Sequence, residues 1–208
     1  MLSRLNAGTW LAGTALCLSA LGAHAAGDPA VGEKKFYTCY GCHGVVDYKH
    51  AYPEYSVPKL RHQNFEYLVA ALREYRSGER PDATMHAQAI TLTDQDIDDI
   101  AAYLQGAAAA KPDAPHGQAP QQAAPCVACH GENGLGVAAP LDPKPPVLAG
   151  QHADYLEQAL IAYRNGRRKN VVMGGMAQML KSAEDVKIVA DYFASQPSRL
   201  GTATTESK

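Results

Sequence analysis

The chain has 208 residues, enough for one ordinary domain or two small ones. Hydrophobic residues make up 46% and charged residues 19%, a composition that excludes a disordered acidic tail and a charge-rich coiled coil. The formal net charge of -2 gives no overall case for binding nucleic acid.

Residues 1–25 have the order of a signal peptide. Arg4 is their single charged side chain, an apolar stretch follows, and residues 23–25 form an A-x-A site. The apolar stretch is short for a membrane span and is diluted by glycine, serine and threonine. We therefore expect cleavage near residue 25 and export to the periplasm.

Each half of the remaining chain is predicted to be helical. Asp28 is a plausible N-cap before Pro29, and the T-D-Q-D run that begins at Thr93 resembles a capping box. No segment shows a convincing strand alternation, so we expect an all-α fold. The expected helices are 29–41, 64–77 and one starting at Thr93, then 119–130, 153–165 and 182–195.

Two identical C-x-x-C-H motifs are the most informative feature of the chain. Two cysteines three positions apart on a helical turn, followed at once by a histidine, suit covalent haem attachment. The cysteines would form two thioethers to the porphyrin edge, and the histidine would bind the iron. The residues concerned are Cys39, Cys42 and His43, and Cys126, Cys129 and His130.

Three other uses of paired cysteines are less favoured. A structural disulfide needs no histidine after each pair, and a thioredoxin-like redox pair expects a βαβ setting. A zinc site built from both pairs expects roughly 15–20 intervening residues, far fewer than separate Cys42 from Cys126 here. The motifs therefore predict two covalently bound haem c groups.

The two motifs belong to an internal repeat with an offset of 87 to 89 residues. Pro58-Lys59-Leu60 matches Pro146-Val147-Leu148, and Tyr67-Leu68 matches Tyr155-Leu156. An Ala/Pro/Gln-rich stretch between the copies is typical of a linker. We therefore expect two small domains, 26–106 and 118–208, joined by a linker at 107–117.

One methionine in each copy stands in matching register and is the candidate sixth iron ligand. In the first copy it is Met85 and in the second Met173, with Met176 as a rival because Gly174-Gly175 would allow close approach. Methionine opposite histidine raises the potential of a haem and suits electron transfer. His50, His62, His86 and His152 are alternative ligands, but none has a histidine at the equivalent position of the other copy.

At these residues the sequence resembles the dihaem cytochrome c4 family and its cytochrome c553-like relatives. The match rests on both C-x-x-C-H-G motifs, both P-x-L and Y-L elements, the Y-R-x-G runs at 75–78 and 163–166, and the methionines. The resemblance implies two tandem class I cytochrome c domains, each with a few helices around one covalent haem and His/Met ligation. Residues 45–57 differ from the small-residue loop that the family carries after the motif.

The resemblance implies an electron carrier and not an enzyme. It implies transfer of single electrons in the periplasm between respiratory donors and a terminal oxidase, a membrane cytochrome complex or another redox enzyme. A cytochrome subunit of a sulfide or alcohol dehydrogenase complex carries the same motifs and is the alternative. Peripheral association with a membrane also stays open, whereas a nucleic-acid partner is not expected.

Charge differs between the two copies. Residues 27–106 carry 8 basic and 12 acidic groups, whereas residues 118–208 carry 9 and 8. The basic run at 164–169 either steers a redox partner, or is a solvated loop, or pairs with haem propionates.

Overall fold

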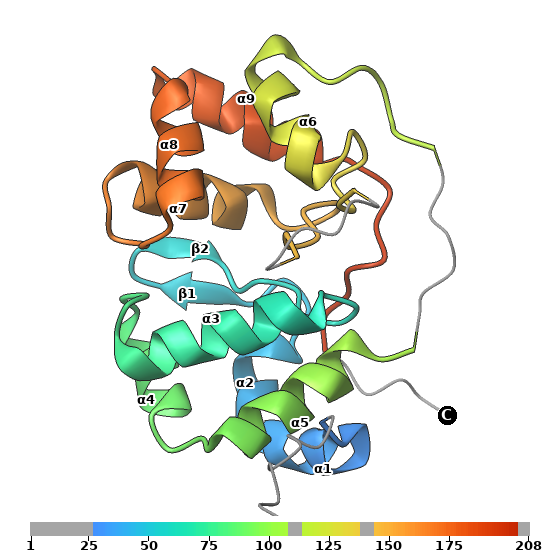
Figure 1. The fold of residues 1–208 in the computed structure, drawn as a ribbon, viewed down its shortest axis with the longest axis vertical. Helices are drawn as coiled ribbons and strands as arrows, with labels where there is room; N and C mark the ends of the chain where they lie inside the picture. Colours follow the sequence, from blue (N-terminus) through green and yellow to red (C-terminus); the bar gives the residue numbers. More distant parts are fainter. Residues whose placement is uncertain (1–26, 108–113, 138–143, 204–208) are drawn as a thin grey trace, which may run out of the picture.

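Two helical layers, one for each copy of the repeat, lie one above the other (Figure 1). The computed structural model describes residues 27–107, 114–137 and 144–203. The predicted signal peptide and most of the predicted linker lie outside the described residues, and both stay predictions. The all-α expectation is confirmed in the main, because helices form almost all of the regular structure in both layers.

The first layer contains the expected helices together with shorter ones. Asp28 accepts hydrogen bonds from the backbone N–H groups of Ala30 and Val31, and Thr93 forms a complete capping box with Asp96. Both predicted helix starts are therefore confirmed. Its helices are α1 (Pro29–Lys35), the 3₁₀ turn η1 (Phe36–Cys39), α2 (Tyr40–His43), α3 (Phe65–Ser77), α4 (Ala83–Ala89) and α5 (Asp94–Gln105).

The second layer repeats this order. Pro125 has no N–H to donate, so it is tolerated only in the first turn of a helix, and the last helical stretch before His130 begins just ahead of it. Asn170 caps one later helix and Ser182 forms a capping box with Asp185 in another. The elements are η2 (Gln121–Ala123), α6 (Ala124–His130), α7 (Ala153–Arg164), α8 (Val171–Met179) and α9 (Ala183–Ala194).

The expectation of a single helix over 29–41 is wrong in detail. The chain tightens to 3₁₀ winding at Phe36–Cys39 and resumes as α2. The tighter winding changes the angle between successive side chains. Phe36 consequently enters the core, where it is 1% exposed, while Cys39 packs at the edge of that core.

A short antiparallel hairpin also departs from the prediction that no strand is present. Strands β1 (Lys49–Ala51) and β2 (Glu54–Ser56) pair with His50 opposite Tyr55. The His50 and Tyr55 rings stack with centroids 5.5 Å apart, and Lys49 forms an exposed ion pair with Glu54. Three residues per strand are too few to show an alternating pattern, which is why the hairpin escaped notice. The hairpin lies between the layers, where β2 contacts α7 (Figure 1).

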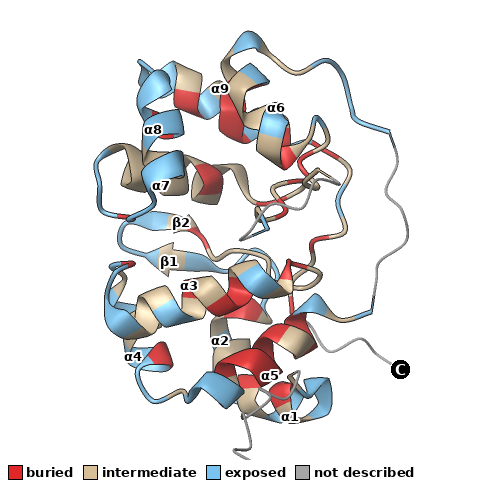
Figure 2. Ribbon diagram, in the orientation of Figure 1, coloured by how far each residue is buried: buried red, intermediate tan, exposed pale blue. Residues whose placement is uncertain are grey.

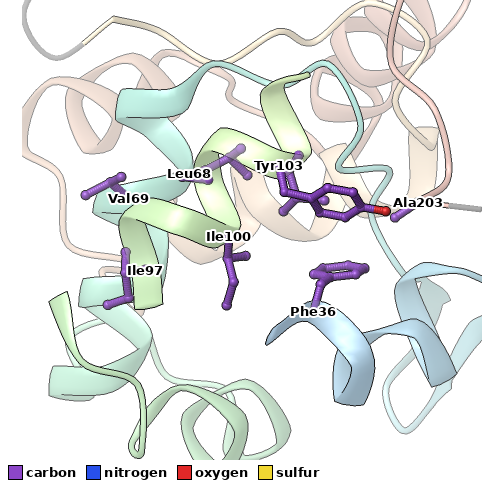
Figure 3. Packing of buried hydrophobic residues seen from close by; sticks show 9 residues of the cluster. Phe36, Leu68, Val69, Ile97, Ile100, Tyr103 and Ala203 are labelled. Atoms are coloured by element: carbon purple, nitrogen blue, oxygen red, sulfur yellow. The ribbon is translucent and has the colours of Figure 1, made fainter. Parts of the chain in front are cut away.

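Each layer has its own apolar core, and Figure 2 shows the buried positions on the inner faces of the helices. In the first core, Ile97 and Ile100 of α5 face Leu68 of α3 and Phe36 (Figure 3). The second core uses Val186, Val189 and Phe193 of α9 with Leu156 of α7.

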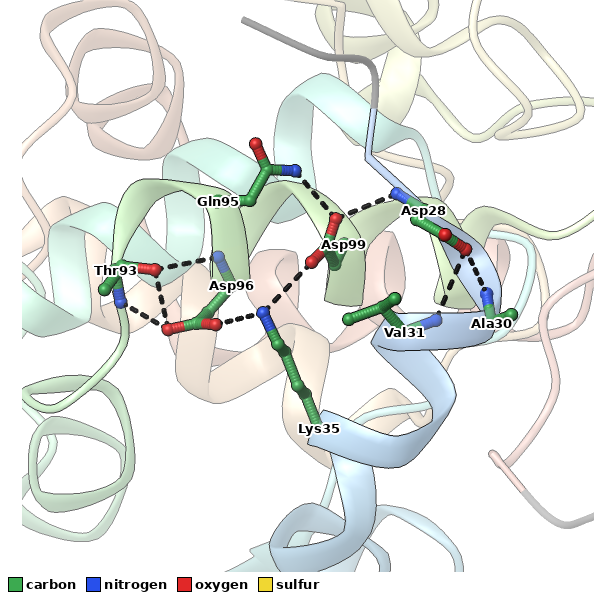
Figure 4. Close-up of polar contacts among 8 residues, drawn as sticks. All are labelled: Asp28, Ala30, Val31, Lys35, Thr93, Gln95, Asp96 and Asp99. Carbon is green, nitrogen blue, oxygen red and sulfur yellow. Dashed lines mark hydrogen bonds and ion pairs between the residues drawn. The ribbon is translucent and has the colours of Figure 1, made fainter.

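Helix α1 crosses α5 at very close range. A Cβ atom on Gly32 would lie 1.9 Å from the Asp99 carbonyl oxygen, so only glycine fits there. Beside this crossing, Lys35 bonds to both Asp96 and Asp99, and Asp99 also accepts from the backbone N–H of Asp28 (Figure 4). These contacts fix the chain segment that leads into the first motif.

The last described residues of the chain return from the second layer to the first. We call residues 197–203 the C-terminal strap. Gly201 pairs with Arg61, the Ala203 N–H donates to the His43 carbonyl at 2.9 Å, and Ala203 is fully buried in the first core. Among the described residues, every helix is too short or too polar to cross a bilayer.

Candidate functional site

Both C-x-x-C-H motifs end in a buried histidine on a short helix. His43 is 8% exposed at the end of α2, and His130 is 6% exposed at the end of α6. The four motif cysteines are half-buried and free of disulfides. Burial raises the pKa of the Cys39 and Cys126 thiols, so both stay protonated. The cysteines are therefore available for bonding to another group.

Each motif histidine is oriented by a prolyl carbonyl. His43 Nδ1 lies 3.1 Å from the Pro58 oxygen, and His130 Nδ1 lies 3.3 Å from the Pro146 oxygen. Because a carbonyl can only accept, each Nδ1 must carry the proton. Burial lowers the pKa of both histidines, so the rings are neutral and Nε2 keeps its lone pair. A histidine that binds a metal usually donates its other ring N–H to a carbonyl or carboxylate in the same way, which fixes the orientation of the ring.

The two register-matched methionines occupy the same place on equivalent helices. The Met85 N–H donates to Asp82 Oδ1 at 2.8 Å, and the Met173 N–H donates to Asn170 Oδ1 at 2.9 Å. In both cases a capping side chain holds the backbone of the third helical residue. Asp82 also acts on His43, because its charge partly offsets the lowering of the His43 pKa by burial. The start of α4 therefore lies near the first motif.

The second layer brings its candidate residues around one cavity of about 390 Å³. Cys126, Cys129, His130 and Met173 all line it. Met176 is not among the lining residues and is 36% exposed. The remaining walls are mainly apolar, which is the usual character of a cofactor site. The chemistry of this donor set, with two thiols, an oriented imidazole and a thioether, fits a haem c group.

The alternative histidine ligands lie elsewhere. His50 stacks on Tyr55 in the hairpin, and His86 Nδ1 lies 2.8 Å from the Tyr75 carbonyl. His62 pairs its backbone N–H with Leu104, and His152 precedes the first residue of α7. Among the described residues that line the cavity, His130 is the one histidine.

Residues of the first layer close the other side of the same cavity. Leu60, Gln63 and Tyr67 line it together with the second motif. Tyr67 and Tyr155 do not pack only within their own domains. Instead, their hydroxyl groups meet at the contact between the layers, where Arg80 donates to both, at 3.4 and 2.8 Å.

Several interface residues were missed in the sequence although the repeat register contains them. Gln63 and Gln151 stand 88 positions apart, as do Arg80 and Arg168. Arg168 was assigned to a basic run with three possible roles. It is buried in the structure, whereas Arg167 and Lys169 of that run are exposed. Extending the repeat alignment from apolar to polar positions would have found all four residues.

The chain is similar to known c-type cytochromes along both copies of the repeat. The family model described as cytochrome c matches residues 30–108 and again residues 116–196. A cytochrome c4 from Pseudomonas aeruginosa is 32% identical over 191 residues, which cover 82% of this chain and 90% of that protein. A thiosulfate dehydrogenase electron acceptor from Stutzerimonas stutzeri is 34% identical over 212 residues, covering 88% of this chain and 93% of that protein.

A solved structure shows the same arrangement of helices. The crystal structure of reduced recombinant cytochrome c4 from Pseudomonas stutzeri superimposes with a TM-score of 0.64 at 29% identity. The superposition covers 82% of this chain and all of that one.

Proposed function

This chain belongs to the cytochrome c family, and within it to the dihaem cytochromes c4, and on that premise we propose that it carries single electrons in the periplasm between respiratory donors and a terminal oxidase or another redox enzyme. It has two tandem cytochrome c domains and binds two covalent haem c groups. A haem c iron supplies reversible one-electron exchange.

One observation carries the proposal of transfer through the molecule. The cavity that holds the second motif is walled partly by Leu60, Gln63 and Tyr67 of the other domain. A haem bound in this cavity would therefore border the first domain directly. This supports entry of an electron at one domain and exit at the other.

We assign the residues that hold each cofactor from the register and the donor chemistry. Cys39, Cys42, Cys126 and Cys129 form the thioethers, and His43 and His130 bind the irons through Nε2. The carbonyls of Pro58 and Pro146 keep these imidazoles neutral and aligned. Met85 and Met173 are the sixth ligands. The place of Met173 on the cavity wall supports it over Met176.

Buried surroundings suit this role because they exclude water from the irons. A low dielectric and two strong ligands from the protein would keep the structural change on reduction small. Optical spectroscopy and potentiometry of the purified protein test the carrier function. We expect two low-spin haems with sulfur-to-iron charge transfer and two reversible one-electron steps. A high-spin haem at neutral pH would contradict it and favour catalysis.

A role as the cytochrome subunit of a periplasmic oxidoreductase complex is the second candidate, with a sulfide or alcohol dehydrogenase as examples. The relative named as a thiosulfate dehydrogenase electron acceptor supports a partner of this kind. Stable copurification of a catalytic subunit with stoichiometric haem would favour the subunit role. A protein that purifies alone and is reoxidised rapidly by membranes with a terminal oxidase would favour the carrier.

The proposed mature protein starts near residue 26, with domains at 26–106 and 118–208 and a linker at 107–117. Intact mass spectrometry of periplasmic material tests the first point. The expected mass is that of the chain without residues 1–25 plus two haem groups. A retained segment would contradict export by cleavage.

A further inference from the structure

Two arginines are buried at the contact between the domains without a carboxylate partner. Arg80 is 5% exposed and Arg168 is 9% exposed, and they occupy equivalent positions of the repeat. Among the described residues, neither forms an ion pair. Burial of an uncompensated charge is very costly, and two such charges close together cost more.

Tyrosine hydroxyl groups link the two arginines. Arg80 donates to Tyr155 at 2.8 Å and to Tyr67 at 3.4 Å, while Arg168 donates to Tyr67 at 3.3 Å. Both guanidinium groups therefore share one acceptor oxygen. Each also stacks on a tyrosine of its own repeat, Arg80 on Tyr75 at 4.5 Å and Arg168 on Tyr163 at 4.6 Å.

These contacts leave the positive charge of both arginines without a negative partner, and some of their N–H groups without an acceptor. Arg80 Nη1 and Arg168 Nε are buried and make no hydrogen bond. The positive field is strong enough to lower the pKa of Tyr67 to about 8, although burial alone would raise it. Glu74 is the acidic group that acts on both arginines, but burial raises its pKa. Both arginines act to lower that pKa, but no ion pair joins Glu74 to either guanidinium in the described part of the chain.

The position of the arginines indicates which anion is missing. Arg168 lines the same cavity as Cys129, His130 and Met173. A haem c group carries two carboxylates on one edge of its porphyrin, and the guanidinium fork matches a carboxylate in shape and charge. Arg80 occupies the equivalent position of the first copy, so the same pairing is expected there.

We propose that Arg80 and Arg168 bind the carboxylates of the two haem c groups, and that Tyr67, as their shared acceptor, joins them into one cationic site that acts on both irons. The inference rests on the two haem c groups and not on the identity of any electron partner. A positive charge stabilises the reduced iron, which has one positive charge fewer than the oxidised iron. Because the two cations are linked, removal of either lowers both reduction potentials.

Potentiometric titration of arginine variants tests this site. We compare Arg80→Gln and Arg168→Gln with Arg76→Gln and Arg164→Gln. The control arginines are also 88 positions apart, and they bind the carbonyls of Leu92 and Leu180 away from the cluster. Haem content is first verified as two per chain, which separates a loading defect from an electrostatic effect.

Both one-electron steps should shift to lower potential in each cluster variant and neither should shift in the controls. A variant that moves a single step would show two independent sites and overturn the coupling. Unchanged potentials would overturn the binding itself. Arg→Lys at each position keeps the charge, so its potentials should lie nearer the wild type than those of the Gln variant. A merely structural role would not produce this order.

Two further measurements complete the test. A free solution anion could supply the same chemistry as a haem carboxylate, and inorganic phosphate is the probe for it. Potentials that depend on phosphate at constant ionic strength would overturn the haem assignment, whereas constant potentials support it. If the Gln variants do not accumulate with two haems, Tyr67→Phe is titrated instead. Both steps should then move together, and movement of one step alone would overturn the shared site.

Discussion

The Gln63 side chain holds Val147 of the other domain by both of its backbone polar groups. Gln63 Oε1 accepts from the Val147 N–H at 2.7 Å, and Gln63 Nε2 donates to the Val147 carbonyl at 2.9 Å. Gln151 makes the same pair of bonds with Lys59, at 2.9 and 3.0 Å. Since Lys59 and Val147 are themselves equivalent, the contact has the reciprocity of a twofold interface. A duplicated domain thus meets its copy much as two identical subunits would.

Removal of either glutamine amide should weaken the contact between the domains. Gln63→Ala leaves both backbone groups of buried Val147 without partners, which should lower the free energy of unfolding by about 2 kcal/mol. Gln151→Ala should act similarly through Lys59. Urea denaturation of the dihaem protein measures the loss. Gln88→Ala, at an exposed position of α4, should change stability by less than about 0.5 kcal/mol. Equal effects at all three positions would contradict the reciprocal contact.

The sixth ligands can be assigned by three methionine variants. Met85→Ala and Met173→Ala should each remove about half of the sulfur-to-iron charge-transfer absorbance, because each affects one of two haems. Each should also lower one of the two reduction potentials. Met176→Ala should leave both signals intact, since Met176 is exposed outside the cavity lining. If Met176→Ala removes the band and Met173→Ala does not, the assignment in the second domain is wrong.

The parts of this molecule that depend on local pattern could be predicted from sequence. The caps at Asp28 and Thr93 are confirmed because capping depends on residues within one turn. The helices that carry apolar stripes end within one or two residues of the predicted limits. The cysteine and histidine motifs likewise indicate a cofactor without any knowledge of the fold.

The contact between the domains could not be predicted in the same way, because its bonds join residues at least 75 positions apart, such as Arg80 and Tyr155. Arg168 shows the difficulty. In sequence it belongs to a basic run with three possible roles, and only the structure shows that the turn after α7 directs it inward onto Tyr163. Its burial depends on the position of the other domain, which no local pattern reports.

Acid should weaken the contact between α1 and α5. Lys35 and Thr93 bond to Asp96 and lower its pKa to about 2. An aspartate whose pKa is lowered in the folded state contributes stability above its unfolded value near 4, and that contribution is lost as the pH falls through about 2. Asp96→Asn should therefore cost stability at pH 6 and cost progressively less between pH 4 and pH 2.

Urea denaturation at several pH values measures this difference. Asp47→Asn is the matched control, because Asp47 is exposed and asparagine also tolerates its positive φ of 55°. The control should change the free energy of unfolding at pH 6 by less than about 0.5 kcal/mol. A constant penalty for Asp96→Asn down to pH 2 would mean that the carboxylate is not the group that titrates.

The C-terminal strap should stabilise the first domain although it follows the second in sequence. Its Ala203 N–H binds the carbonyl of His43, and Leu200 packs with Val147 and Ala149 at the contact between the domains. A chain that ends after Gln196 loses these hydrogen bonds and the buried Leu200 side chain, offset in part by the regained freedom of the strap. We expect a loss of about 1–3 kcal/mol in the free energy of unfolding.

A chain that ends after Ala203 keeps every one of these contacts and should be as stable as the full chain. Because the Ala203 N–H binds the His43 carbonyl, the chain that ends after Gln196 should also show an altered spectrum of the first haem. Equal stability of the two truncated chains would show that the strap does not hold the first domain.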